Sequence, residues 1–270
     1  MIDKVHRLGG LFFYQGGKIM PEINKANREV CDVYFCDVKT RKPFLYFDTA
    51  NTTTVGLTGD AVYAMAKGAR RIAFANPMSG QISIACQVYP YKFFAMFSDG
   101  VYENSAIYAD KQTVECSKAG ELTLTVPKSG TIQVGTVFAY PDGSLGDDTA
   151  MIDGTYADGK FTAAAEKIVA GSKYVVGYIV NRTGVRKISF TNKKYPKDYY
   201  ITMSTLDKDE NGIMTPFRIV VYKATPQRNF ELTFNSEGDP ATVNMTLDIL
   251  EDKDGNVLDF IEIQEDASNS

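Results

Sequence analysis

The chain has 270 residues, of which 44% are hydrophobic and 23% are charged, and its formal net charge is −4. It contains a single histidine, His6, so a histidine-rich metal site, a Ser-His-Asp triad or a Cys-His pair would have to be built on that one residue. We therefore expect no enzymatic activity, no metal and no cofactor. No run of about 18 apolar residues occurs, and we also expect no membrane span.

The N-terminal stretch contains a short apolar segment, Leu11–Tyr14, which lies between Gly9-Gly10 and Gly16-Gly17. This pattern fits an apolar arm and a plain edge strand equally well. If it is an arm, Phe12 and Phe13 would have to be covered by something, which points to a partner subunit.

The four cysteines are Cys31, Cys36, Cys86 and Cys116, and none of them forms a CxxC pair. Cys31 and Cys36 fall on a predicted strand, where their odd separation places the two side chains on opposite faces. We therefore expect buried free thiols, which suit assembly in a reducing cytoplasm.

The segment Lys39–Thr58 is polar and rich in Thr and Asn. It is long for a connection between two strands of a hairpin. We interpret it as a surface loop.

Alternation of apolar and polar residues recurs along the whole chain and predicts half-buried strands. Turn signals such as Pro141-Asp142-Gly143 and Asp254-Gly255 separate these segments. The alternating segments are 82–88, 122–126, 132–138, 217–222, 230–234 and 243–249. The sequence therefore predicts a mostly β protein.

The segment Pro90–Gly100 departs from this alternation. Phe93, Phe94 and Phe97 fall at helical spacing, with Pro near the first turn and Gly just past the end. We predict one short α-helix that flanks the sheet. Phe161–Val169 is a second helical candidate, but strand and turn fit it equally well.

The middle block, residues 118–185, has few charges, many Gly, Thr and Ala, and its own strand and turn signals. It fits either an inserted β module or a long two-stranded excursion of the main sheet. The last third is acidic instead, with ten acidic residues and one lysine between Glu237 and Ser270.

The segment Asp207–Gly212 begins like a calcium-binding loop, with oxygen-bearing side chains at its first, third and fifth positions and Gly at the sixth. The twelfth position is Arg218, where such a loop needs a bidentate Glu. We therefore predict a polar hairpin turn here rather than a metal site.

Three stretches together resemble the major tail tube proteins of tailed bacteriophages. They are Gly59–Phe74, a hairpin pattern followed by Gly80–Ile84 and the predicted helix; Tyr195–Thr202; and Arg228–Leu250, which is followed by Asp254-Gly255. The resemblance covers most of residues 30–117 and 186–263. It implies a β-sandwich or barrel-like tail tube fold with one short flanking helix and an inserted β segment.

This resemblance divides the chain into three parts. Residues 1–117 and 186–263 would form a discontinuous tail tube core, 118–185 an inserted β-rich segment, and 264–270 a polar C-terminal tail. The implied function is that of a structural virion protein. Six copies would close a ring, and stacked rings would form a hollow tube that conducts DNA into the host cell.

The resemblance also implies the partners and the location of the protein. It would be assembled in the bacterial host cytoplasm and become part of the virion tail. Its partners would be other copies of itself, a tail terminator, a baseplate or tip and, where the tail contracts, a sheath. DNA would pass through without specific binding.

A DNA conduit must not bind DNA, because each Lys or Arg contact to a phosphate adds salt-sensitive affinity. An acidic lumen would repel the polyanion. The candidate lumen-facing residues are Asp248, Glu251, Asp252 and Glu262. A solvated outer face is an equally good interpretation of these four residues.

Two regions are candidates for contacts between stacked rings. One is the N-terminal arm with Phe12 and Phe13, and the other is the segment Lys39–Thr58. Within that segment the candidate residues are Lys39, Arg41, Asn51 and Thr52.

An alternative function is that of a carbohydrate- or surface-binding β-sandwich module. Tyr195, Tyr199 and Tyr200 could then form a platform on which a sugar stacks. The competing interpretation is that these tyrosines are half-buried strand residues.

Overall fold

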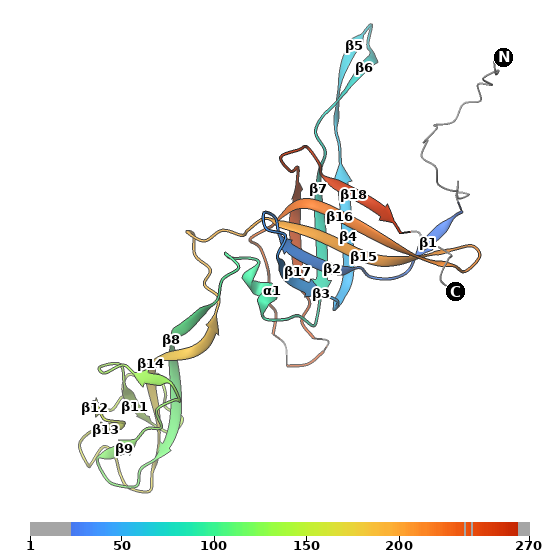
Figure 1. Ribbon diagram of the computed structural model, residues 1–270. Coiled ribbons are helices and arrows are strands. Elements are labelled where there is room, and N and C mark those ends of the chain that lie inside the picture. The colour runs from blue at the N-terminus through green and yellow to red at the C-terminus, as the bar shows by residue number, and fades with distance from the viewer. Residues whose placement is uncertain (1–22, 235, 239, 264–270) are drawn as a thin grey trace, which may run out of the picture.

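The computed structural model describes residues 23–234, 236–238 and 240–263 (Figure 1). It consists mostly of antiparallel strands, which confirms the mostly β fold class predicted from the alternation. Two hydrophobic clusters organise the chain, one within a large sheet and the other within a group of smaller sheets.

The largest sheet contains nine antiparallel strands. They are β1 (Lys25–Asn27), β2 (Asp32–Asp37), β3 (Pro43–Phe47), β4 (Ala50–Thr58), β7 (Ser79–Cys86), β15 (Tyr199–Asp209), β16 (Met214–Pro226), β17 (Val243–Leu250) and β18 (Leu258–Glu262). Their spatial order is β3-β2-β15-β16-β17-β7-β4, with β1 added to β15 and β18 added to β16.

Strand β16 connects the two halves of this sheet. Its residues 217–221 pair with β18, and its residues 223–226 pair with β17. As a result, β4, β7 and β17 run across the direction of β2, β15 and β16 (Figure 1). Within the described part of the chain the sheet does not close into a barrel, because β3 and β4 each pair with a single neighbour.

The core lies between these two halves. Val33 and Phe35 of β2, and Ile82 and Ile84 of β7, all belong to one cluster and are at most 1% exposed. Every second residue of these strands contributes to the core because side chains alternate between the two faces of a strand. The remaining residues of β4, β7 and β17 point away from the core and are mostly exposed.

The predicted flanking helix is present but short, since α1 spans only Lys92–Ala95. Phe93 is buried and stacks on Phe47, with ring centroids 5.4 Å apart. Turns follow the helix, and the Gly100 N–H donates to the Ala95 carbonyl from a left-handed conformation. No helix among the described residues has the length and apolar character needed to cross a membrane.

The second helical candidate forms a strand followed by turns. Strand β13 (Lys160–Thr162) occupies its start, and Lys167 and Ile168 are held in turns by the Ala164 carbonyl. Phe161 and Ile168 are buried in the second hydrophobic cluster. The apolar residues thus mark burial rather than a helical face.

Seven strands surround the second cluster. They are β8 (Glu103–Glu115), β9 (Glu121–Thr123), β10 (Gly130–Ile132), β11 (Phe138–Pro141), β12 (Thr155–Ala157), β13 and β14 (Lys173–Lys187). The long strands β8 and β14 pair over most of their length and lead away from the large sheet (Figure 1). We call residues 103–187 the β8–β14 module. For residues 118–185 the sequence left open an inserted β module and a long two-stranded excursion of the main sheet. The β8–β14 module has features of both, because it has a hydrophobic core of its own and joins the large sheet through the two long strands β8 and β14.

The hairpin predicted within Gly59–Phe74 is formed by β5 (Ala61–Ala66) and β6 (Ala69–Ala75). Lys67 and Gly68 make the turn, both with positive φ, as a two-residue hairpin loop requires. The hairpin extends from the end of β4 and β7 and projects beyond the large sheet (Figure 1).

Two smaller predictions can also be checked. Residues 207–212 end β15 and enter the turn to β16, where Asp209 Oδ1 accepts hydrogen bonds from the N–H groups of Asn211 and Ile213. This is the predicted polar turn.

All four cysteines are free, as expected, and three are buried while Cys31 is partly exposed.

Candidate assembly surfaces

Both faces of the β5–β6 hairpin are apolar and open to solvent. Val62 pairs with Phe74 and Ala64 with Ile72, which places these four side chains on one face. Val62, Ile72 and Phe74 are 57–59% exposed, and so is Met65 on the other face, at 59%. Burying one such side chain contributes roughly 1.5–3 kcal/mol. The hairpin is therefore a surface that gains stability when another surface covers it.

The tip of the hairpin is basic. Lys67, Arg70 and Arg71 lie within Ala61–Ala75, and this segment contains no acidic residue. The Arg70 guanidinium lies 4.3 Å from the centre of the Tyr63 ring, so the ring holds it over the second face. A surface that covers the hairpin would be expected to be apolar with acidic residues at its border.

The outward face of β4, β7 and β17 is polar and carries almost no charge. Cross-strand pairing aligns Thr54 with Ser83 and Thr246, and aligns Gln81 with Asp248. None of the three strands contains Lys or Arg, and Asp248 is their one acidic residue. Hydroxyl and amide groups therefore dominate this face, which we call the polar sheet face.

Asp248 is held in place on this face by two amides. Its Oδ1 atom accepts hydrogen bonds from Gln81 Nε2 at 3.0 Å and from Gln227 Nε2 at 2.8 Å. Both donors are neutral amides, so these hydrogen bonds fix the direction of the carboxylate without placing a positive charge beside it.

The other three acidic candidates lie elsewhere. Glu251 is exposed just after β17, and Asp252 closes the following turn by accepting the N–H groups of Asn256 and Asp254. The hydrogen bond from the Asn256 N–H is the main cause of a lowered pKa for Asp252. Glu262 lies on β18 and forms an ion pair with Lys25 of β1. The structure does not bring the four carboxylates together on one face.

The candidate stacking residues are also spread out. Phe12 and Phe13 lie outside the described residues. Lys39 and Arg41 are exposed in the turn between β2 and β3, where the Arg41 guanidinium lies 3.9 Å from the centre of the Tyr200 ring.

The interpretation of Lys39–Thr58 as one loop is wrong, because the whole of β3 and the whole of β4 lie within it. Asn51 and Thr52 belong to β4 and are exposed. Thr is a good strand former, and a strand with one face in solvent can be as polar as a loop.

The three tyrosines do not form a common platform. Tyr199 is 1% exposed and belongs to the core, whereas Tyr200 lies on the opposite face of β15. Tyr195 lies before the strand and is 64% exposed. The tyrosine platform predicted for sugar stacking is therefore wrong, because neighbouring strand residues point in opposite directions.

The strands at the two ends of the main strand order, β3 and β4, are open edges whose outer backbone groups have no strand partner among the described residues. Open edges can pair with strands of another chain. Sequence reasoning located the hairpin but missed its exposure, because an apolar alternating segment is typical of a buried strand. The hairpin is apolar, has three basic residues and has no acidic residue, and this composition is the signal that could have shown its exposure.

A comparison with protein-family models identifies the family of the chain. The model of the YomU/Tube protein family matches residues 27–263, which include nearly all of the described chain. No curated protein matches the chain. Because the family match covers far more than half of the sequence, the chain belongs to the YomU/Tube family and is a structural protein of a phage tail tube.

Proposed function

We propose that six copies of this chain close a ring and that the rings stack into a tube through which DNA is ejected into the host cell. The observation that carries this proposal is the exposed apolar hairpin. A protein that acts alone rarely leaves such a surface uncovered, whereas a subunit of a polymer covers it on assembly. Membership of the tube family supports this interpretation.

The open edges supply the ring contacts. In a closed ring, the free edge of β4 of one subunit pairs with the neighbouring subunit, and the sheet continues around the bore. A ring with cyclic symmetry uses the same two surfaces at every interface, so one pair of edges closes the whole ring.

The polar sheet face lines the bore in this proposal. Its three strands offer no Lys or Arg to bind phosphate, and Asp248 adds one negative charge per subunit. A ring then carries six fixed carboxylates at one level, which repel DNA and keep it moving. The acidic lumen proposed from the sequence is thereby narrowed to Asp248.

The hairpin and the opposite end of β4 provide the stacking contacts. The β4–β7 pair begins at Ala50 with Cys86 and ends at Thr58 with Ser79, after which the hairpin begins. Asn51 and Thr52 thus lie at the end remote from the hairpin. If β4 runs along the tube axis, the hairpin reaches the next ring on one side, and Asn51 and Thr52 face the ring on the other. Phe12, Phe13, Lys39 and Arg41 remain candidates for further contacts between rings.

The three-part division of the chain fits this arrangement. The core of residues 1–117 and 186–263 supplies the tube wall, except for residues 103–117 and 186–187, which belong to the β8–β14 module. Residues 118–185 form the rest of that module, and their buried residues belong to the second cluster. The β8–β14 module extends from the large sheet in a different direction from the hairpin (Figure 1), and in this proposal it lies on the outside of the tube. Residues 264–270 form a C-terminal tail.

The assembled tube would join a tail terminator at one end and a baseplate or tip at the other. Assembly takes place in the host cytoplasm, where free thiols are stable. The subunit acts by assembling, and we assign it no catalytic step.

Size measurement and electron microscopy of the purified chain test this proposal. We expect rings of six 29.8-kDa chains, about 180 kDa, or longer tubes with a central channel in negative stain. The double variant Ile72→Ser/Phe74→Ser should lose stacked tubes, because it removes about half of the apolar surface from one face of the hairpin.

The control for this variant is Val134→Ser, which changes a valine that is 77% exposed in the β8–β14 module. This variant should assemble normally. A wild-type chain that stays monomeric at high concentration, or an Ile72→Ser/Phe74→Ser variant that forms tubes as long as those of the wild type, would contradict the proposal.

A further inference from the structure

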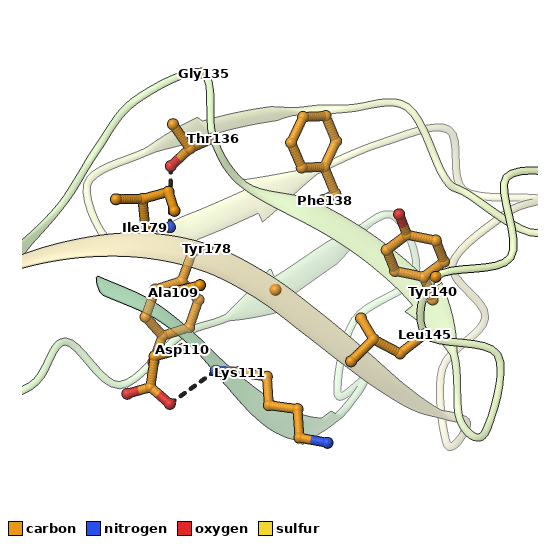
Figure 2. Close-up of a pocket in the computed structure, with 12 residues that line it drawn as sticks. Ala109, Asp110, Lys111, Gly135, Thr136, Phe138, Tyr140, Leu145, Tyr178 and Ile179 are labelled. Atoms are coloured by element: carbon orange, nitrogen blue, oxygen red, sulfur yellow. Dashed lines mark hydrogen bonds between the residues drawn. The ribbon is translucent and has the colours of Figure 1, made fainter. Parts of the chain in front are cut away.

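An open groove lies on the outward face of the β8–β14–β11 sheet. It has a volume of about 760 Å³, and its lining is more apolar than polar. Figure 2 shows Phe138 and Tyr140 on one side of β14, and Ala109 and Lys111 on the other. Binding pockets for small molecules typically have this size, with an apolar lining and a few polar groups.

Gly177 forms the floor of the groove. Cross-strand pairing places Gly177 of β14 between Phe138 of β11 and Lys111 of β8. Neighbouring strands are about 4.8 Å apart, so the two flanking residues stand about 10 Å from each other. Because Gly177 has no side chain, this row contains a slot that any other residue would fill.

The walls of the slot are fixed by their surroundings. Leu145 overhangs the floor, and a Cβ atom placed on Gly177 would lie 3.6 Å from its Cδ1 atom. At the opposite end, Thr136 Oγ1 accepts the Ile179 N–H at 3.1 Å and ties its loop to β14 (Figure 2). The slot is therefore formed before any ligand binds.

The chemistry of the lining suits a ligand that has both an apolar face and polar groups. The Phe138 ring is 44% exposed and offers a flat, electron-rich face. Lys111 pairs directly with Gly177, so its side chain stands on the groove face and places an ammonium group, a hydrogen-bond donor, beside the slot. Asp110 pairs with Tyr178 of the second cluster, and its side chain points to the opposite face of β8.

We propose that this groove binds a saccharide, with one pyranose ring lying over Gly177. The C–H groups on one face of the ring pack against Phe138, since these weakly positive groups suit the negative face of an aromatic ring. The hydroxyl groups at the ring edge accept hydrogen bonds from the Lys111 ammonium group. An open groove leaves both ends of the ring free, so a longer chain can extend out of it.

This site is separate from the surfaces assigned to assembly. Its residues belong to the β8–β14 module, whereas the hairpin and the polar sheet face belong to the large sheet. Saccharide binding therefore does not depend on ring formation. It can be tested on the unassembled chain, and its failure would leave the tube proposal untouched.

The test is saturation-transfer-difference NMR on the full chain with maltose, lactose and N,N′-diacetylchitobiose as probes. We expect transfer to the ring C–H protons of at least one of the three, with a dissociation constant on the order of 1 mM, since a small ligand in an open groove gains little affinity. Gly177→Val should weaken binding by at least about tenfold, because its branched side chain fills the slot.

Gly177→Val should fold normally. The backbone of Gly177 does not have a positive φ, and the added Cβ meets only Leu145 at an ordinary contact distance. The matched control is Thr113→Val, which adds a branched apolar side chain to the same face of β8 outside the groove and should bind like the wild type. A second pair is Phe138→Ala, which should lose binding, and Phe138→Tyr, which should keep it.

Three results would overturn the proposal. One is the absence of saturation transfer from the wild-type chain to all three sugars. Another is equal binding by the wild type and by both Gly177→Val and Phe138→Ala. The third is binding of N-acetyl-phenylalaninamide with no binding of any sugar, which would identify an aromatic peptide side chain as the occupant.

Discussion

The hydroxyl group of Tyr199 is buried in the main core without a hydrogen-bond partner among the described residues. The Phe44 and Phe35 rings pack around it, with centroids 5.1 Å and 6.1 Å from that of Tyr199. Burial raises the pKa of Tyr199 far above its ordinary value, and Asp37 and Asp99 add to the shift. A buried unpaired hydroxyl costs about 1–3 kcal/mol.

We predict that Tyr199→Phe leaves the thermal unfolding midpoint unchanged or raises it, because the variant removes the unpaired group and keeps the ring. The stability gain should be at most about 3 kcal/mol, the upper end of the cost of the unpaired hydroxyl. The comparison variant is Tyr222→Phe, whose hydroxyl donates to Asp259. It should have a slightly lower midpoint. A clear drop for Tyr199→Phe would mean that its hydroxyl has a partner.

At the scale of elements, a cluster of ion pairs holds the base of the β8–β14 module. Glu103 at the start of β8 bonds to Lys187 at the end of β14 and to Lys194 in the segment that leads back to β15. Lys194 also pairs with Asp99, which follows α1, at 3.2 Å. The hydrogen bonds from Lys187 and Lys194 lower the pKa of Glu103 to about 2.

Because the pKa of Glu103 is lowered in the folded protein, the stability that its ion pairs contribute depends on pH. A carboxylate whose folded-state pKa is lowered contributes its stability above its ordinary pKa, here 4.5, and loses it as the pH falls towards 2. We predict that Glu103→Gln at pH 7 increases hydrogen exchange in residues 186–194, and that the wild type shows the same increase only when acidified below pH 4.5. Glu115→Gln, at the other end of β8, is the control. Equal exchange in Glu103→Gln and the wild type at pH 7 would show that the ion-pair cluster does not hold the base of the β8–β14 module.

Elements differ in how well the sequence predicts them. The helical spacing of Phe93, Phe94 and Phe97 predicts α1, and the hairpin pattern of Gly59–Phe74, part of the family resemblance, predicts β5 and β6. The segment from Lys39 to Thr58 was mistaken for a loop, because a polar strand face has the composition of a loop.

The functional surfaces were harder to predict, since each depends on residues brought together by pairing. Gly177 illustrates this, because its place between Phe138 and Lys111 follows from the register of three strands. A glycine within an apolar alternating run was the one available signal for an open site there. Asp248 could be named from the sequence, but its face could not, since the face depends on the register of β17 with β7.

At the scale of the whole molecule, the net charge of −4 is divided unevenly. The hairpin carries three positive charges, whereas ten acidic residues lie between Glu237 and Ser270. In the proposed tube, each weak binding site is present in many copies. If each groove binds a saccharide with millimolar affinity, many grooves on one tube bind a cell surface with much higher avidity, because the second and later contacts are intramolecular.

Because every subunit contributes the same residue, one substitution changes the charge of the whole proposed lumen. Asp248→Lys would replace six carboxylates per proposed ring with six ammonium groups at one level of the bore. We predict that tubes of this variant retain short fluorescent duplex DNA during sedimentation, and that added salt releases it, with a log–log slope of about 0.9 per phosphate contact. Tubes of the wild type should retain none.

The matched control is Asp142→Lys, which makes the same charge change at an exposed position of the β8–β14 module. Thr54→Lys provides a second lumen variant that leaves the hydrogen bonds of Asp248 intact, since Thr54 lies on the same face of the neighbouring row. Both lumen variants should hold DNA that Asp142→Lys tubes release, because only a charge inside the bore meets DNA on every side. If all three variants bind DNA equally, the polar sheet face does not line the channel.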